Sequence, residues 1–558
     1  MKFSLPTAAT ATATALLAGM LASSQVASAA PPTPSSKTYT ELYRPQFHYS
    51  AAKNWLNDPN GLVYHDGVYH LYYQHNPGGT TWGAMSWGHA SSRDLTRWTE
   101  HPVALQARGF PDNITEMFFS GTVVVDERNT SGFGKRGKVP WVAMYTSYYP
   151  VEQTLPSGKH VRKDQQAQSI AYSLDKGMTW TTYDAANPVI AEPPAQYADQ
   201  VLEFRDPGVF WHDESSQWIA IVSLAKLHKV LIYTSHNLKD WTVASEFGPV
   251  NAVGGVWECP SIFPLSLDGG DELKWILMLG LNPGGPPGTV GSGSQYIVGN
   301  FNGTTFTADE DSIYTPDDSD PDSQIANWLD YGPDFYAALG FNGLPREQRT
   351  IIAWMNNWQY ANIIPTDPWR SAMSSPRHLA LKTIAGKARL VSEPAARLKT
   401  FGGRTFSFRR VEGERGLGRL GKALEIELEF SRKASGAAEG EFGIAVAATK
   451  DFAQETRVGY DFSTGRVFVD RSRSGDVSFD GTFASTYYAP LALGADGRVS
   501  LRILLDWSSV EVFGGDGEAT ITSQIFPAKD AAYSRLFSTG GETGNVKVRV
   551  KEVRSAWR

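Results

Sequence analysis

The sequence predicts an all-β protein in which a five-bladed β-propeller is followed by a C-terminal β-sandwich. Short strand-like runs such as "SQWIAIVSL", "KVLIYTS" and "KWILMLGL" dominate the first 380 residues, and long amphipathic helical patterns are missing there. A Ser/Trp pattern recurs in the same region, and regular alternating strands follow it. The length of 558 residues favours two domains over one.

An internal repeat predicts the blades. The stretches "SSRDLTRWTEH", "SLDKGMTWTTYD" and "SHNLKDWTVAS" each carry Ser, then Asp or Asn, and then a tryptophan: Trp98, Trp180 or Trp241. Repeats at such spacings, with room for several strands each, are typical of propellers. About 345 residues from Tyr39 to Lys382 hold five blades of roughly 70 residues. The alternative is a long β-sandwich in which these matches arise by chance.

Turn signals and composition predict the domain boundaries. "LVYHDGVYHLYYQ" is typical of a hairpin, with two aromatic or β-branched runs around Asp66-Gly67. Later runs such as "ALEIELEFS" and "FGIAVAAT" are short alternating strands, which predict a sandwich. We therefore expect a propeller over residues 39–384, a basic, Gly-rich linker over 385–410 and a sandwich over 411–558.

The N-terminus resembles an export signal. It has one Lys, then a short Ala/Leu core, and then Ala27-Ser28-Ala29. This layout predicts a signal peptide over residues 1–29, followed by a Pro/Ser-rich tether over 30–38. A membrane anchor is the alternative, but the apolar core is short for a bilayer and rich in Ala and Thr. We expect a secreted, extracellular protein without a membrane partner, whose single cysteine, Cys259, forms no internal disulfide.

The net charge and the N-glycosylation sequons indicate which kinds of partner the chain can have. The net charge is -7, and no basic cluster with interleaved aromatic residues is present, which argues against a nucleic-acid partner. A neutral or small polar ligand fits better. Three N-x-S/T sequons, at Asn113, Asn129 and Asn302, are glycan acceptors if the chain passes through a eukaryotic secretory pathway. We expect a monomer.

Three acidic residues stand one or two positions before a proline: Asp58-Pro59, Asp206-Pro207 and Glu258-Cys259-Pro260. The residue before a proline favours extended backbone, and proline is excluded from the middle of a central strand. Each acid is therefore expected at the rim of a strand. Because the acids are far apart in the sequence, they fall on different blades, and the innermost strands of the blades meet at the propeller axis. The three carboxyls can converge there.

Convergent carboxyls suit either glycosidic cleavage or binding of a hard metal such as Ca²⁺. Metal loops usually cluster their oxygens locally, as "DDSDPDS" at Asp317–Ser323 does, and we interpret that stretch as a solvated acidic loop. The aromatic surroundings favour a sugar, because aromatic faces pack on sugar rings and amides bind hydroxyls. Taken singly, each tryptophan fits the core better than a ligand platform.

Several motifs together resemble glycoside hydrolase family 32, the β-fructofuranosidases: "WLNDPNG", "FSG", "FRDP" and "ECP". Longer stretches resemble the fungal exo-inulinases of that family, among them "YTSYYPVEQTLPSGK", "LNPGGPPGTVGSGSQY", "YGPDFYAA", "WMNNWQYA" and "PWRSAMSSPRHLALKT". The resemblance covers essentially the whole mature chain. It implies a five-bladed propeller with an appended β-sandwich.

The resemblance also implies roles. Asp58 matches the nucleophile, Glu258 the general acid/base and Asp206 the stabiliser of the transition state. The residues that match the surroundings of the terminal fructose are Asn57, Gln74, Trp82, Ser120, Arg205 and Trp358. This machinery implies retaining double displacement, which requires the two catalytic carboxyls to lie about 5 to 5.5 Å apart. The resemblance implies neither a metal nor an organic cofactor. Cys259 is expected to be a small buried residue and not a nucleophile.

The implied function is an exo-acting fructan hydrolase that releases fructose from inulin, levan and sucrose. An invertase, a levanase and a fructosyltransferase are alternatives with the same carboxyls. A carbohydrate-binding protein with a dead site is a different class, and the presence of all three acids speaks against it. The sandwich is expected to brace the propeller, with sugar binding and dimerisation as alternatives.

Overall fold

The computed structural model describes residues 39–314, 325–432 and 440–557. The expected signal peptide, the tether and the acidic loop at Asp317–Ser323 lie outside the described residues. Strands dominate these ranges, in which the helical elements are short 3-10 turns: η1 (Ala195–Gln200), η2 (Ala225–Leu227), η3 (Glu310–Ser312) and η4 (Arg346–Gln348). Within the same ranges, no helix has the length and apolar character needed to span a bilayer.

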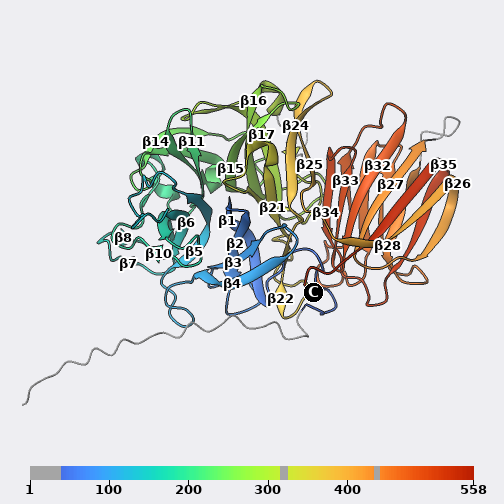
Figure 1. Ribbon diagram of the computed structural model, residues 1–558, viewed down its shortest axis with the longest axis horizontal. Helices are drawn as coiled ribbons and strands as arrows, with labels where there is room; N and C mark the ends of the chain where they lie inside the picture. The colour runs from blue at the N-terminus through green and yellow to red at the C-terminus, as the bar shows by residue number, and fades with distance from the viewer. Residues whose placement is uncertain (1–38, 315–324, 433–439, 558) are drawn as a thin grey trace, which may run out of the picture. The chain divides into compact units, whose positions relative to one another are not determined.

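Five sheets follow one another along the chain (Figure 1). The first two contain β1 (Asn54–His65), β2 (Val68–Asn76), β3 (Ser86–Ser92), β4 (Trp98–Leu105) and β22 (Trp369–Arg370), and then β5 (Met117–Val125), β6 (Trp141–Tyr149), β9 (Gln165–Ser173) and β10 (Thr181–Thr182). The third contains β11 (Phe204–His212), β12 (Gln217–Leu224), β13 (Lys229–Ser235) and β14 (Thr242–Phe247).

The fourth sheet contains β15 (Val256–Ser266), β16 (Leu273–Asn282), β17 (Gly293–Phe301), β18 (Phe306–Ala308) and β19 (Asn327–Trp328). The fifth contains β20 (Tyr336–Gly340), β21 (Thr350–Met355), β23 (Ala372–Met373), β24 (Arg377–Ile384) and β25 (Lys387–Pro394). A separate small hairpin pairs β7 (Gln153–Thr154) with β8 (His160–Val161).

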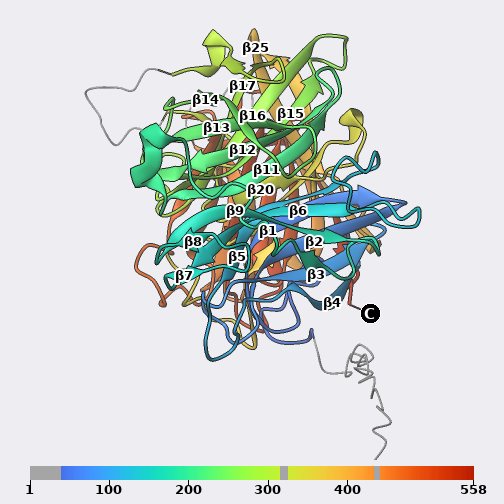
Figure 2. The ribbon, with the colours of Figure 1, turned by 90° about the vertical axis from the view of Figure 1, so that its left-hand side faces the viewer.

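The innermost strands close a ring. Contacts run from β1 to β5, from β5 to β11, from β11 to β15, from β15 to β20, and from β20 back to β1; Figure 2 labels all five strands. Strand β22, which follows the second strand of the fifth sheet, pairs in parallel with β1 at Asn54 and Trp55. The five sheets are thus the blades of a five-bladed propeller, and this part of the predicted fold is confirmed.

The local sequence signals explain the blades. Asp66 and Gly67 join β1 to β2 with φ of 50° and 76°, the left-handed pair that a tight two-residue hairpin needs. The repeat marks one turn in three blades: Ser92, Ser173 and Ser235 end the third strand of their blades. Each hydroxyl accepts a backbone N–H from the turn that leads to the fourth strand. The serine therefore fixes the same corner in each blade.

The C-terminal strands form one sheet that folds into a sandwich. Long strands β26 (Thr400–Arg419) and β35 (Tyr533–Val553) run side by side, and one half of β35 pairs with β28 while the other half pairs with β27 (Figure 1). Apolar side chains from both halves form a single core. The remaining strands are β27 (Leu424–Arg432), β28 (Glu441–Ala448), β29 (Glu455–Asp461), β30 (Arg466–Arg473), β31 (Thr486–Pro490), β32 (Arg498–Asp506), β33 (Ser509–Gly514) and β34 (Ala519–Gln524). The predicted sandwich is confirmed.

The expected linker over residues 385–410 is not a linker in the structure. Residues 387–394 form β25, the outermost strand of the fifth blade, and β26 begins at Thr400. Most side chains of β26 are exposed, so its composition is polar, basic and Gly-rich. Its backbone nevertheless pairs with β35, because ladder hydrogen bonds do not depend on the side chains. The connection between the two domains is therefore only residues 395–399.

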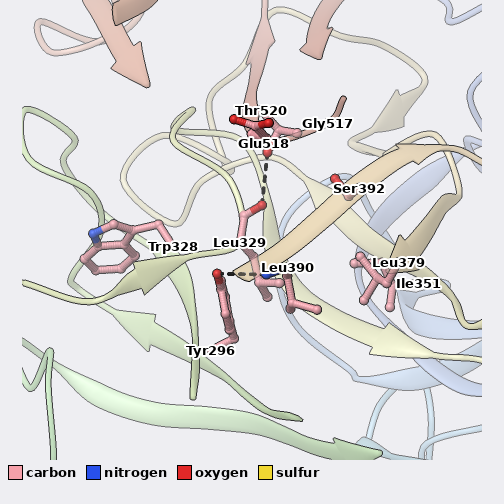
Figure 3. A pocket seen from close by; sticks show the side chains of 10 residues that line it. All are labelled: Tyr296, Trp328, Leu329, Ile351, Leu379, Leu390, Ser392, Gly517, Glu518 and Thr520. Carbon is pink, nitrogen blue, oxygen red and sulfur yellow. Dashed lines mark hydrogen bonds between the residues drawn. The ribbon is translucent and has the colours of Figure 1, made fainter. Parts of the chain in front are cut away.

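Buried polar contacts join the fifth blade to the sandwich. Arg377 donates from Nη1 to Asp330 at 2.7 Å and from Nη2 to Glu511 at 2.8 Å. A cavity of about 10 Å³ lies at the same junction, and Figure 3 shows its lining, in which the Thr520 hydroxyl donates to the backbone carbonyl of Leu329. A void of this size holds about one water molecule. It is therefore too small for a sugar.

Candidate active site

The five innermost strands share one irregularity. In each of them, the pairing with the second strand of the blade is shifted by a one-residue β-bulge, which follows Leu56, Phe118, Arg205, Glu258 or Tyr336. Bulges re-aim side chains and are frequent next to active sites. Hydrogen bonds across the blades connect the polar residues at these bulges: Asp58, Ser120, Asp206, Glu258 and Tyr336.

The prolines that marked the acids belong to these bulges. Pro207 and Pro260 have no partner in the ladder, and Pro59 is the first paired residue after its bulge. A missing N–H costs little where the ladder is already interrupted. Asp206 and Cys259 take φ of 63° and 49°, a left-handed backbone that is unusual for residues other than glycine. The acids therefore lie at bulges near the start of their strands, close to the predicted strand rim.

Asp58 is buried and held by two donors. The Ser120 hydroxyl donates to Oδ2 at 2.7 Å, and the Asn57 amide donates to Oδ1 at 3.1 Å. Asn57 is in turn fixed by the indole N–H of Trp55, which donates to its Oδ1 at 2.7 Å. Burial raises the pKa of Asp58 to about 6, although both donors act in the opposite direction.

Cys259 joins two of the carboxyls. Its backbone N–H donates to Oδ2 of Asp206 at 3.0 Å, and its Sγ lies 3.6 Å from Oδ2 of Asp58 and 3.7 Å from Oδ2 of Asp206. Burial raises the pKa of Asp206 and of the Cys259 thiol above their ordinary values. A buried thiol between two carboxyls stays protonated, so its environment does not produce a thiolate nucleophile.

Glu258 is held by a cation and a hydroxyl. Nε of Arg205 donates to its Oε1 at 3.0 Å, and the hydroxyl of Tyr336 donates to its Oε2. Nε of Arg205 also lies 4.0 Å from Oδ2 of Asp206, so the guanidinium neighbours two of the three acids. The pKa of the Tyr336 hydroxyl is raised well above its ordinary value by burial and by the charge of Glu258.

The remaining predicted residues surround this group. Gln74 on β2 is buried and donates to the backbone carbonyl of Phe118 at 3.0 Å. Trp82 is 41% exposed, and its ring meets that of Phe119 edge-on at 6.0 Å, next to Ser120. The sequence reasoning expected most tryptophans in the core, and Trp82 is an exception.

Trp358 is half-buried and packs on two other indoles. Its ring centre lies 5.9 Å from that of Trp55 and 4.8 Å from that of Trp354, which are both fully buried. Trp55 donates to Asn57, and Asn57 donates to Asp58. A chain of contacts therefore connects Trp358 to Asp58 through Trp55 and Asn57. Direct contacts, or contacts through one or two intervening residues, thus connect all nine predicted site residues.

Sequence reasoning missed two polar residues, Tyr336, which contacts Glu258, and Glu203, which contacts Arg205. Tyr336 begins the fifth inner strand and lies within "YGPDFYAA", but no acid-proline pair marks that strand. Glu203 precedes Phe204 in the third blade, and its carboxylate accepts a hydrogen bond of 2.7 Å from Nη1 of Arg205. The only signal for Glu203 was its place two residues before Arg205.

Three connected carboxyls, of which Asp58 and Asp206 are buried, favour acid–base chemistry. Burial and the charges of the neighbouring acids disfavour full ionisation, so the group retains a proton at mildly acidic pH. A carboxylate and a carboxylic acid then coexist, as cleavage of a glycosidic bond requires. Across residues 39–314, 325–432 and 440–557, no set of three His, Cys, Asp or Glu side chains is arranged to hold a metal ion.

Comparison with known families identifies this arrangement. The profile of the glycosyl hydrolases family 32 N-terminal domain matches residues 48–394, and that of the glycosyl hydrolases family 32 C terminal matches residues 403–552. This chain belongs to glycoside hydrolase family 32. The resemblance that the motifs indicated is thereby confirmed for both domains of this family 32 protein.

Curated relatives and solved structures agree with the family. The family 32 chain is 57% identical to the extracellular exo-inulinase of Aspergillus ficuum, over 93% of this chain and 96% of that protein. It is 41% identical to a levanase of Bacillus subtilis, over 94% of this chain and 72% of that protein. The crystal structure of the exo-inulinase from Aspergillus awamori superposes with a TM-score of 0.89 at 57% identity, covering 93% of this chain and 100% of that one.

Proposed function

We propose that this protein is an exo-acting fructan hydrolase that releases terminal β-D-fructose from inulin, levan and sucrose. The observation that carries the proposal is the convergence of Asp58, Asp206 and Glu258 from three blades, joined by Cys259 and Arg205. The high identity to proteins named exo-inulinase, and the lower identity to a levanase, support a fructan as the substrate class.

In the first step of the proposed mechanism, Asp58 attacks the anomeric carbon of the terminal fructosyl unit. The bond from that carbon to the leaving oxygen breaks, and Glu258 gives its proton to that oxygen. A covalent fructosyl ester on Asp58 results. The hydrogen bonds from Ser120 and Asn57 support the ionised form of Asp58 that this attack requires.

In the second step, Glu258 takes a proton from water and the resulting hydroxide oxygen attacks the anomeric carbon. The ester bond to Asp58 breaks, fructose leaves, and both carboxyls return to their starting states. Asp206 accepts hydrogen bonds from fructosyl hydroxyls as charge develops on the ring. Its distance from the backbone N–H of Cys259 and its buried position suit a fixed acceptor.

The remaining substrate contacts are proposed for Gln74, Trp82, Arg205 and Trp358. Trp82 is the most exposed of these side chains and suits the outer face of the bound sugar. Alanine at Trp82 is expected to raise KM for fructans more than it lowers kcat, because the indole supplies binding area and no proton. Steady-state kinetics on inulin measure this difference.

Export and modification are part of the proposal. We infer cleavage after Ala29 and secretion, and relatives of this chain are named extracellular. Asn113, Asn129 and Asn302 are exposed, as glycan acceptors must be. N-terminal sequencing and mass spectrometry of the protein secreted by a eukaryotic host, before and after deglycosylation, test both points. Light scattering of the same material tests the expected monomer.

A time course of products from inulin, levan and sucrose, resolved by chromatography, tests the activity. Fructose alone from the first minutes is the expected result and indicates exo attack. Short oligosaccharides at early times would indicate endo attack, and products longer than the substrate would indicate fructosyl transfer. No product from any of the three would overturn the hydrolase and favour a carbohydrate-binding protein.

A further inference from the structure

The Arg205 guanidinium divides its donors between two carboxylates. One edge donates to Glu258, from Nε at 3.0 Å, with Nη2 also 3.0 Å from the same oxygen. On the other side, Nη1 donates to Glu203 at 2.7 Å and to the amide oxygen of Gln166 at 3.3 Å. The guanidinium is almost fully buried, so these partners determine its orientation.

A lysine forms an ion pair with Glu203. Nζ of Lys226 lies 2.7 Å from Oε1 of Glu203. The backbone N–H of Ala225 donates to the carbonyl of Glu203 at 2.8 Å, which fixes η2 and its lysine beside the carboxylate. Burial acts to raise the pKa of Glu203, but the hydrogen bonds from Arg205 and Lys226 outweigh it and lower the pKa. The lowered pKa favours the ionised form of Glu203.

The proposed chemistry makes this arrangement necessary. A general acid must hold its proton when substrate binds, whereas a guanidinium in contact with a carboxyl favours loss of that proton. Arg205 touches Glu258 directly, so its charge opposes the first step unless another group offsets it. Among the residues that the structure describes, Glu203 supplies the carboxylate that contacts Arg205 on the side away from Glu258.

We propose that Glu203 is a positioning residue for this reaction, which holds Arg205 in place and offsets its charge so that Glu258 keeps its proton, while Lys226 limits that effect. The inference rests on the proposed hydrolase function. Glu203 itself touches neither the anomeric carbon nor the leaving oxygen in the proposed mechanism. The other titratable groups that face Glu258 belong to β1, β11, β15 and β20, and they are Asp58, Asp206, Cys259 and Tyr336.

The test compares two substitutions with opposite charge effects, Glu203→Gln and Lys226→Gln, in the full-length protein. Fructose release from sucrose is followed as kcat/KM against pH at low ionic strength. Removing the Glu203 charge leaves Arg205 uncompensated, so the alkaline limb is expected to move to lower pH by about half a unit to one unit. Removing Lys226 makes the site more negative, so the limb moves to higher pH, by less because Lys226 is exposed.

A matched control comes from the same blade. Glu246 pairs with Lys229 on the outer strands of the third blade, away from the acids. Glu246→Gln is expected to leave the pH profile unchanged. The proposal would be overturned if the alkaline limb of the pH profile stayed in place in both test variants, or if it moved in the same direction in both. If Glu203→Gln does not fold, the upward shift in the Lys226 variant decides alone, and its absence would overturn the proposal.

The wild-type protein separates this inference from the function on which it rests. Absence of fructose release by the wild type would overturn the hydrolase itself, and the inference with it. Fructose release by the wild type together with unshifted variants would overturn the inference alone. Glu203→Asp, which keeps the charge, is expected to restore the position of the limb even where it lowers kcat through a longer gap to Arg205.

Discussion

The hydroxyl of Ser120 donates a hydrogen bond of 2.7 Å to Oδ2 of Asp58, from the innermost strand of the second blade to that of the first. Both groups are buried. A carboxylate taken out of water depends on such donors, because burial alone favours its neutral form. The contact therefore ties the protonation of Asp58 to the packing of two neighbouring blades.

Ser120→Ala is expected to move the acid limb of the pH profile upward. Removing the donor raises the pKa of Asp58 further above its present value of about 6, so less of the carboxylate is ionised at acidic pH. A hydrogen bond to a charged group contributes about 1.5 to 3 kcal/mol, which corresponds to a shift of roughly one pH unit or more. The measurement is kcat/KM for sucrose between pH 3 and pH 8.

Ser523→Ala is the matched control, because Ser523 is buried in the sandwich and its hydroxyl has no partner within the described residues. This control should reproduce the wild-type profile. If the acid limb does not move in the Ser120 variant, the result would contradict either the assignment of Asp58 as the nucleophile or the support of its ionised form by Ser120.

Glu258→Gln is expected to retain sugar binding and to lose turnover. Glutamine keeps the size of the side chain but cannot donate a proton to the leaving oxygen, and general acid–base catalysis contributes roughly 100- to 10 000-fold. Calorimetric binding of fructose and rates of fructose release separate the two effects. Glu272→Gln, at an exposed carboxylate, serves as control. Turnover near that of the wild type would refute the acid/base assignment.

Tyr336→Phe is expected to lower kcat/KM by about tenfold and to move the alkaline limb to higher pH. The lost hydroxyl is a donor to Glu258, and without it the ionised carboxylate is less well stabilised. The control is Tyr145→Phe, since the buried hydroxyl of Tyr145 lacks a partner among the described residues. Equal effects of the two substitutions would mean that only packing had changed.

His48 is expected to make stability depend on alkaline pH. It is fully buried, with Nδ1 2.9 Å from Asp506 and Nε2 2.8 Å from Glu511. Burial alone would lower its pKa, but the hydrogen bonds to the two carboxylates outweigh burial and raise the pKa to about 9. Because the folded pKa lies above the unfolded one, the stabilisation is complete below pH 6.5 and is lost as pH rises through 9. Its size is roughly 3 kcal/mol, from about 2.5 pKa units at 1.36 kcal/mol each.

The measurement is Tm at a fixed scan rate from pH 6 to pH 10, for the wild type and His48→Gln. We expect a lower Tm for the variant at pH 6 and a difference that shrinks toward pH 10. His160→Gln is the control, because His160 is exposed and pairs with Glu152 at the surface. A constant difference across the whole range would show that His48 acts through packing and not through its charge.

Local sequence patterns predicted much of the fold. In β27, the alternation of Leu424, Ile426, Leu428 and Phe430 with glutamates predicted a strand with one buried face, and all four apolar residues lie in the sandwich core. The same logic failed for β26, whose exposed side chains resemble those of a linker. Its strand conformation comes from pairing with β35, which is more than a hundred residues away in the chain.

By itself, the sequence determined the all-β class, the blade repeat, the family motifs and the candidacy of Asp58, Asp206 and Glu258, because these depend on periodicity and on proline next to acids. Only the tertiary structure decided the partners of each acid: Ser120 for Asp58, Cys259 for Asp206, and Arg205 with Tyr336 for Glu258. These contacts join strands of different blades. Hydrogen bonds require donor and acceptor within about 3 Å. Closure of the ring, together with the bulge in each inner strand, brings the atoms to that distance, and no local pattern records the closure.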